Sequence, residues 1–220
     1  MTPQVRFFSE PPVNRREILR YAGAKDGAAD VDALLSDCLK EAGGSFAYRA
    51  CFQEWPLVQN GDSLDLGFAA VRSADLSRAL KGCSRVVVFA ATVGLGIDRL
   101  IARHSRLSPA RALMMQAIGA ERIESLCDAF SRETARLAAE ENLKTTPRFS
   151  PGYGDLPLTL QKNIVQTLDC GRLIGLTLNE SLLMSPSKSV TALIGLGCPT
   201  SAGQGCGACL KTDCAYRRLP

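Results

Sequence analysis

The residues best suited to bind a small ligand lie in one short loop, Arg148-Phe-Ser-Pro-Gly-Tyr153. Pro151 fixes its own φ angle and biases Ser150 toward an extended backbone, while Gly152 allows a positive φ or the close approach of a ligand. Arg148 offers a fork of cationic donors, and Tyr153 offers an aromatic ring with a hydroxyl group. This combination suits a ligand that carries both a carboxylate and a flat ring. The alternative is a plain connection in which Arg148 is solvated and Tyr153 packs.

A second cluster with chemical potential consists of four cysteines near the C-terminus, Cys198, Cys206, Cys209 and Cys214. Only two residues separate Cys206 from Cys209, which lets both thiolates reach one metal ion. Four thiolates suit Zn²⁺ or an iron–sulfur cluster, and the segment has too few apolar residues to fold by burial alone. A redox dithiol of the thioredoxin type and unpaired thiols are the alternatives. The cluster therefore predicts a metal-binding tail over residues 195–220.

Other catalytic constellations find little support in the sequence. His104 is the sole histidine and lies near a predicted helix end, which favours a solvated or capping role over that of a catalytic base. No second member of a Ser-His-Asp or Cys-His arrangement can be identified. Gly94 and Gly96 follow a predicted strand as in a dinucleotide-binding turn, but Arg99 occupies the third glycine position. A dinucleotide site is therefore a poor interpretation.

Composition excludes several classes of protein. The chain has 220 residues of which 46% are apolar, enough to bury a full core. Its net charge of +4 comes from 26 basic and 22 acidic residues, and no basic run is interleaved with aromatic residues, so we expect no nucleic-acid binding. Because no long apolar segment is present, we expect no membrane association and a cytoplasmic location. The remaining cysteines lie in apolar contexts and are expected to be small buried residues: Cys38, Cys51, Cys83, Cys127 and Cys170.

Helix and strand patterns alternate along the chain and place these residues on a scaffold. A β-branched apolar run at 84–92 predicts a buried central strand, and Ser108-Pro109 predicts the start of a long helix that reaches about Glu140. That helix must bracket much of the sheet. The other predicted helices cover residues 14–21, 31–42, 73–80 and 95–103, and the other predicted strands cover residues 46–55 and 58–68, the second interrupted by an Asn60-Gly61 turn.

Two motifs, together, resemble a known family. The first is Arg148-x-x-Pro151-Gly152-Tyr153, and the second follows downstream. Its residues are Leu178-Asn-Glu-Ser181, Met184, Pro186, Ser189 and Val190. In order and spacing, residues 147–194 resemble the C-terminal activation domain of cobalamin-dependent methionine synthase, and the earlier part of the chain resembles standalone relatives of that domain more loosely.

The resemblance implies a fold and a ligand site. It implies an α+β domain over residues 1–194, with an antiparallel sheet bracketed by helices, followed by the cysteine-rich tail. The family holds S-adenosylmethionine in the Arg-x-x-Pro-Gly-Tyr loop, with a carboxylate from the long helix. The corresponding residues here are Glu124, Arg148, Ser150, Pro151, Gly152 and Tyr153. Glu124 shares a helix face with Glu121 by i, i+3 spacing, and a solvated helix face is the alternative for both carboxylates.

The resemblance also implies a function. Cob(I)alamin is occasionally oxidised to an inactive cob(II) state, and its recovery requires an electron and a methyl group from S-adenosylmethionine. The sequence lacks the Asp-x-His-x-x-Gly signature of a cobalamin-binding domain, so the cobalamin is expected on a partner: a methionine synthase that lacks this domain, or another corrinoid protein. The protein would then form half of an active site. The alternatives are an iron–sulfur redox protein that donates electrons to a corrinoid protein, and a zinc-stabilised module for sensing S-adenosylmethionine or for docking.

Overall fold

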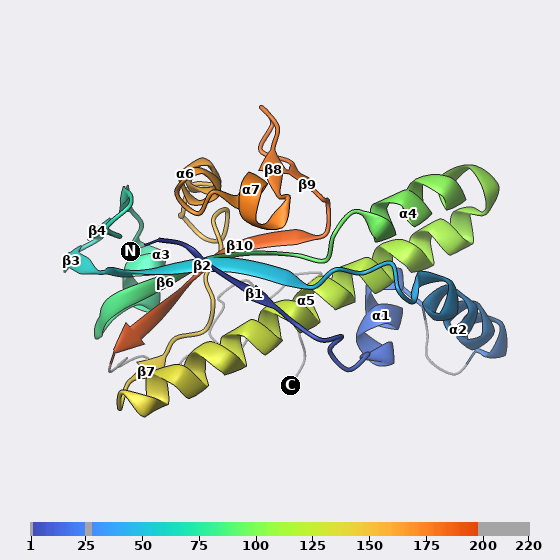
Figure 1. The fold of residues 1–220 in the computed structure, drawn as a ribbon, viewed down its shortest axis with the longest axis horizontal. Coiled ribbons are helices and arrows are strands. Elements are labelled where there is room, and N and C mark those ends of the chain that lie inside the picture. The colour runs from blue at the N-terminus through green and yellow to red at the C-terminus, as the bar shows by residue number, and fades with distance from the viewer. Residues whose placement is uncertain (1, 25–27, 198–220) are drawn as a thin grey trace. The chain divides into compact units, whose positions relative to one another are not determined.

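The computed structural model describes residues 2–24 and 28–197, whose course is shown in Figure 1. A five-stranded sheet has the strand order β1-β2-β6-β10-β7. These strands are, in chain order, β1 (Gln4–Phe7), β2 (Arg49–Pro56), β6 (Cys83–Thr92), β7 (Lys144–Thr145) and β10 (Ser189–Gly197). β1 pairs with β2 and β7 pairs with β10, both antiparallel. The predicted α+β class with an antiparallel sheet is confirmed.

Helices and two smaller sheets complete the described part of the chain. The helices are α1 (Arg15–Ala22), α2 (Ala29–Ala42), α3 (Ala74–Ala79), α4 (Gly96–Leu107), α5 (Pro109–Glu140), α6 (Leu160–Thr167) and α7 (Cys170–Ile174). The small antiparallel sheets are formed by β3 (Val58–Asn60), β4 (Ser63–Asp65) and β5 (Ala70–Arg72), and by β8 (Thr177–Leu178) and β9 (Met184–Ser185).

The helix starts follow local sequence signals. The Asn14 side chain accepts a hydrogen bond from the Glu17 amide at the start of α1, and Ser73 does the same for Leu76 in α3. Both contacts satisfy an amide that the helix itself cannot pair. Pro109 is the first residue of α5, whose 32 residues correspond to about 48 Å at ~1.5 Å per residue. The predicted starts of these three helices are confirmed.

The described residues form two compact units, and the boundaries between them fall within β2, β6, α5, α6 and β10. The first unit contains residues 2–53, 89–130 and 161–191. Its core gathers around Phe130, whose ring lies 4.4 Å from that of Phe89, 5.3 Å from that of Phe52 and 6.4 Å from that of Phe8. Such aromatic clusters contribute large apolar areas to a core.

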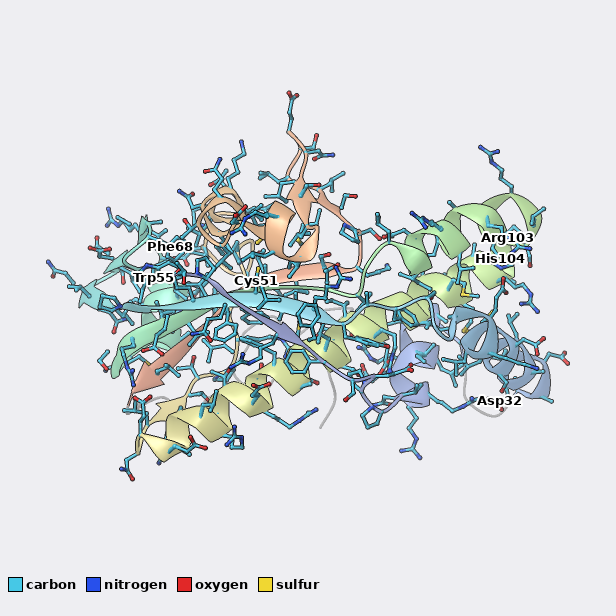
Figure 2. The ribbon with its side chains drawn as sticks, in the orientation of Figure 1. Asp32, Cys51, Trp55, Phe68, Arg103 and His104 are labelled. Atoms are coloured by element: carbon cyan, nitrogen blue, oxygen red, sulfur yellow. The ribbon has the colours of Figure 1, made fainter. Side chains whose placement is uncertain are left out.

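The second unit contains residues 54–88, 131–160 and 192–197. The rings of Trp55 and Phe68 lie 5.2 Å apart, and both side chains are labelled in Figure 2. Gly67, with φ of +78°, passes so close that an added Cβ atom would lie 2.6 Å from the Trp55 ring. Leu76 and Leu80 are fully buried, so that the short helix α3 is held by apolar contact.

The structure also departs from the predicted elements. The strand expected from Phe46 begins at Arg49, and the helix expected to end at Arg103 continues to Leu107. β1, β7 and β10 are additional strands. β10 continues to Gly197, and the predicted tail beyond it, including Cys198, Cys206, Cys209 and Cys214, lies outside the described residues. The division of the chain at residues 194 and 195 stays a prediction.

Candidate functional site

The predicted ligand loop starts from a firm attachment to β10. Phe149 and Leu193 exchange two backbone hydrogen bonds of 2.8 Å, forming an isolated antiparallel bridge. Three residues earlier, the Thr146 amide donates to the Gly195 carbonyl at 3.0 Å, and the Gly195 amide donates back to the Thr146 hydroxyl at 2.9 Å. Arg148 lies between these two attachments and is partly exposed. Its backbone position is therefore fixed by the sheet.

The tip of the loop is a pair of tight turns. The Tyr153 amide donates to the Ser150 carbonyl at 3.1 Å, and the Leu156 amide donates to the Tyr153 carbonyl at 3.0 Å. The Gly152 amide donates to the Leu156 carbonyl at 2.9 Å, which draws the two turns together. Gly152 has φ of +89°, a conformation that L-residues rarely adopt. The positive φ predicted as possible at Gly152 is confirmed.

Within this loop the predicted ligand residues differ in exposure. Pro151 is buried, whereas Tyr153 is 68% exposed. Arg148 and Ser150 are intermediate. The loop thus combines a buried proline with an exposed aromatic residue and a partly exposed cation. These residue types suit an anionic group and a flat ring.

Beyond the tip, the chain is attached a second time, at the N-terminus of α3. The Asp155 carboxylate accepts hydrogen bonds from the Ser73 hydroxyl, from the Ala74 amide at 2.7 Å and from the Asp75 amide at 3.2 Å. The Ser73 hydroxyl, followed by the two amides, holds the pKa of Asp155 below its ordinary value. Asp155 is not among the residues that the sequence predicts for the ligand site. Ser73 predicts the start of α3, but nothing near it in the sequence indicates that Asp155 binds there.

Glu124 comes from another part of the chain. It lies on α5 within the first unit, and it is partly exposed, whereas the Arg148–Tyr153 loop belongs to the second unit. Its participation in the ligand site stays a prediction. The loop residues alone are brought together by the structure.

Glu121, one turn before Glu124, is not part of a solvated helix face. Its side chain is 2% exposed and lies 2.6 Å from the guanidinium of Arg122, which is fully buried. Arg122 also donates to the Pro11 carbonyl at 2.6 Å and to the Pro12 carbonyl at 2.8 Å. The solvated interpretation of Glu121 is wrong, because this ion pair fastens the segment before α1 onto α5.

A shallow hollow of about 380 Å³ lies in the first unit beside this ion pair. Glu10 and Tyr48 line it, and the Tyr48 hydroxyl lies 3.4 Å from the Glu10 carboxylate. Burial raises the pKa of Tyr48 to about 12. None of the predicted ligand residues lines this hollow, so it is not part of the predicted ligand site.

His104 is buried and paired. Its Nε2 atom lies 2.8 Å from the Glu41 carboxylate, and Arg111 donates to the same carboxylate at 3.1 Å. The hydrogen bond from His104 lowers the pKa of Glu41. Figure 2 labels His104 and Arg103 on α4. The prediction of a solvated histidine is wrong, and no capping role of its side chain is shown: the cap at the end of α4 is Ser108, and the His104 ring pairs with Glu41 on α2.

The downstream motif has a structural role in the first unit. The Ser189 hydroxyl lies 2.8 Å from the Thr92 hydroxyl and 2.8 Å from the Pro186 carbonyl, and joins the start of β10 to the end of β6. Ser187 donates its amide to the Asp98 carboxylate at 3.1 Å. These bonds attach the segment after β9 to the start of α4 and to β6.

The glycines that resemble a dinucleotide-binding turn serve packing. An added Cβ atom at Gly96 would collide with the Ser45 carbonyl oxygen, and one at Gly94 would lie 3.2 Å from the Ala47 side chain. Close approach of Ser45 therefore accounts for Gly96, and a φ of +81° favours glycine at position 94.

The cysteines within the described residues are free and buried, as predicted: Cys38, Cys51, Cys83, Cys127 and Cys170. The sulfur atoms of Cys51 and Cys170 lie 3.5 Å apart. Among residues 2–24 and 28–197, no group of three or more metal-ligating side chains is gathered, and no helix is long and apolar enough to cross a membrane. The predicted metal cluster lies outside this part of the chain.

Comparisons with known proteins address the family directly. A search of curated proteins finds no match. The fold is similar to that of a solved structure, the crystal structure of the MetH reactivation domain bound to AdoHcy, with a TM-score of 0.66 and 16% sequence identity over 93% of this chain and 81% of that one. Residues 76–215 match the family model of the vitamin B12 dependent methionine synthase activation domain. Because that match includes most of the chain and both motifs, the chain belongs to the activation-domain family of vitamin B12-dependent methionine synthase.

Proposed function

We propose that this protein binds S-adenosylmethionine at the Arg148–Tyr153 loop and presents it to a cobalamin carried by a partner protein. The observation that carries the proposal is the loop itself, which is attached to β10 and presents Arg148 and Tyr153 in a chain of this family. The similar MetH reactivation domain was crystallised with AdoHcy, a ligand that shares the adenosyl and amino-acid parts of S-adenosylmethionine.

Each loop residue has a role in this proposal. Arg148 pairs with the methionine carboxylate, a charge-assisted contact worth about 1.5–3 kcal/mol. Backbone groups from Ser150 to Gly152 shape the pocket around Pro151. Tyr153 contacts the adenine ring or the ribose, and Glu124 supplies a further carboxylate from α5.

The chemistry of the proposed reaction is mainly positioning. S-adenosylmethionine carries the methyl group on a positively charged sulfur. When the methyl group is transferred, S-adenosylhomocysteine leaves as a neutral thioether, so no general acid is needed. The protein therefore contributes by holding the methyl donor in line with the acceptor. An electron must come from a reductant.

The proposed partner is a cobalamin-dependent methionine synthase that lacks its own activation domain, or another corrinoid protein. The tail over residues 195–220 is proposed to hold zinc or an iron–sulfur cluster through Cys198, Cys206, Cys209 and Cys214. We place the protein in the cytoplasm, because five buried cysteines as free thiols suit a reducing compartment.

Titration calorimetry tests the ligand site. S-adenosylmethionine should bind the wild-type protein, and Arg148→Ala should weaken binding about tenfold or more, as the loss of at least ~1.4 kcal/mol requires. Arg136→Ala is the matched control, because this arginine lies in the same unit with its side chain 65% exposed. Undiminished binding in Arg148→Ala, or equal losses in both variants, would contradict the assignment of the site.

An activity assay tests the partner. A methionine synthase that lacks an activation domain and carries inactive cobalamin should regain activity when this protein, S-adenosylmethionine and a strong reductant are all present. Omission of any one component should abolish recovery. Recovery at the same rate without this protein would remove its proposed role while leaving the binding result intact.

A further inference from the structure

The Arg148–Tyr153 loop is bound at its far end to a helix that lies some eighty positions earlier in the sequence. Both oxygens of the Asp155 carboxylate are used: Oδ1 accepts from the Ser73 hydroxyl and the Asp75 amide, and Oδ2 accepts from the Ala74 amide at 2.7 Å. A carboxylate at these amides is favoured by their orientation and by the positive end of the helix dipole. Asp155 thus acts as an external cap of α3.

The contact is reciprocal. The Asp155 amide donates to the Asp75 Oδ2 atom at 3.1 Å, so that each aspartate accepts a hydrogen bond from the backbone of the other. Gly154, with φ of +54°, allows this approach, because an added Cβ atom would collide with the Asp75 carboxylate. The chain after Tyr153 is therefore held against α3 by backbone and side-chain contacts together.

The helix that receives Asp155 is itself held in place. The Ser73 amide donates to the Asp62 carbonyl at 2.9 Å, and the Ser77 hydroxyl donates to the Gly61 carbonyl at 2.7 Å. Leu76 and Leu80 are fully buried beneath the helix. α3 is thus fixed on the β3–β4–β5 sheet, so the bonds of Asp155 to α3 hold the loop in a fixed position.

The loop is therefore fixed at both ends, and the span between them is short. Phe149 is bonded to β10 on one side, and Asp155 is bonded to α3 on the other. Ser150 to Gly154 lie between them, with Tyr153 exposed at the tip. A span of this length with both ends fixed loses little conformational entropy on binding, which raises affinity.

We propose that Asp155 is a positioning residue for the ligand loop: its bonds to Ser73, Ala74 and Asp75 hold Tyr153 and the backbone of 150–152 in the conformation that binds S-adenosylmethionine. This role rests on the proposed function. It assigns to α3 a part in ligand binding, although no residue of α3 needs to touch the ligand.

The test compares Asp155→Asn with Asp62→Asn, an exposed aspartate of the same unit whose substitution makes the same change in charge. The asparagine keeps the size of the side chain but loses the charge and presents an amide group in place of one acceptor. Asp155→Asn should weaken S-adenosylmethionine binding about three- to tenfold by calorimetry. Asp62→Asn should bind as the wild type does.

Amide hydrogen exchange provides a readout that a general loss of stability would not reproduce. In Asp155→Asn the amides of Gly152, Tyr153 and Leu156 should exchange faster, while those of β6 and α5 keep their protection. Asp75→Asn, which weakens the reciprocal contact from the other side, should produce the same pattern to a smaller degree. It also serves as the second variant if Asp155→Asn does not fold.

The outcomes separate the two proposals. Wild-type affinity and wild-type exchange in Asp155→Asn, with S-adenosylmethionine binding in the wild-type protein intact, would overturn the positioning role alone. Faster exchange across the whole unit would also overturn it, because Asp155 would then be a general stabiliser. Absence of S-adenosylmethionine binding in the wild-type protein would overturn the proposed function and, with it, this role.

Discussion

Replacement of Arg122 by methionine should destabilise the protein strongly. The fully buried guanidinium makes two hydrogen bonds to Glu121, at 2.6 and 2.7 Å, and two to the Pro11 and Pro12 carbonyls, at 2.6 and 2.8 Å. Arg122→Met removes all of them and leaves the Glu121 carboxylate, 2% exposed, without its compensating charge. Loss of one partner of a buried ion pair costs about 3–5 kcal/mol. We expect the free energy of unfolding to fall by about 4 kcal/mol.

Urea denaturation followed by circular dichroism measures this loss. With a denaturant dependence of ~2–3 kcal/mol per molar urea, the midpoint should fall by ~1.3–2 M. In the variant, the Glu121 carboxylate would keep its hydrogen bonds from the Asn14 amide at 3.0 Å and the Ser125 hydroxyl at 2.7 Å. Because these bonds still stabilise the charge, the protein should lose less stability than if a buried carboxylate had no partner. The first contact to weaken should be the attachment of the segment before α1.

A double variant separates charge from packing. Because Glu121→Gln removes the orphaned charge, the pair Glu121→Gln and Arg122→Met should be more stable than Arg122→Met alone by about 1–2 kcal/mol. Arg136→Met, at an exposed i, i+4 pair, should change stability by less than about 0.5 kcal/mol. A loss below ~1 kcal/mol in Arg122→Met, or no recovery in the double variant, would refute the reasoning.

Three further predictions concern other groups. Tyr48, with its pKa raised by burial to about 12 from 10.0, stabilises the fold fully below pH 10.0 and loses that contribution as the pH rises through 12; ultraviolet titration should show one late tyrosine that Tyr48→Phe removes. Cys51 and Cys170 should resist alkylation in the folded protein and react after unfolding, as mass spectrometry of their peptides can check, because contact with Cys51 and burial raise the pKa of Cys170. After anaerobic purification, Cys206→Ser and Cys209→Ser should each lower the metal content and leave the main domain folded, and unchanged metal in both would rule out that site.

Local patterns predict the elements whose residues carry the signal themselves. The apolar run of β6 has one buried residue after another from Val86 to Thr92, and the Ser108-Pro109 start of α5 follows from the fixed φ of proline. β1 and β7 give no such signal. β1 has no buried residue among its four, and β7 has two residues, so both depend on backbone pairing with β2 and β10.

Partners distant in sequence also decide which charged side chains become buried. The sequence around His104 is polar, with Arg103 before it and Ser105 after it, which favours a solvated histidine. Its burial follows from Glu41 on α2, which also accepts a bond from Arg111 on α5. Nothing near His104 in the chain indicates that partner. The same holds for Glu121, whose backbone partner Asn14 lies 107 positions away.

The ligand loop combines both kinds of information. Its proline, glycine, arginine and tyrosine reveal a shaped loop, because turn chemistry is local. Its fixation on β10 and α3 depends on contacts between residues 149 and 193 and between residues 73 and 155, which no local pattern contains. Affinity for a small ligand depends on how well such a loop is held before the ligand arrives. Substitutions at Ser73 or Asp155 should therefore change the affinity of a site whose contacting residues they leave untouched.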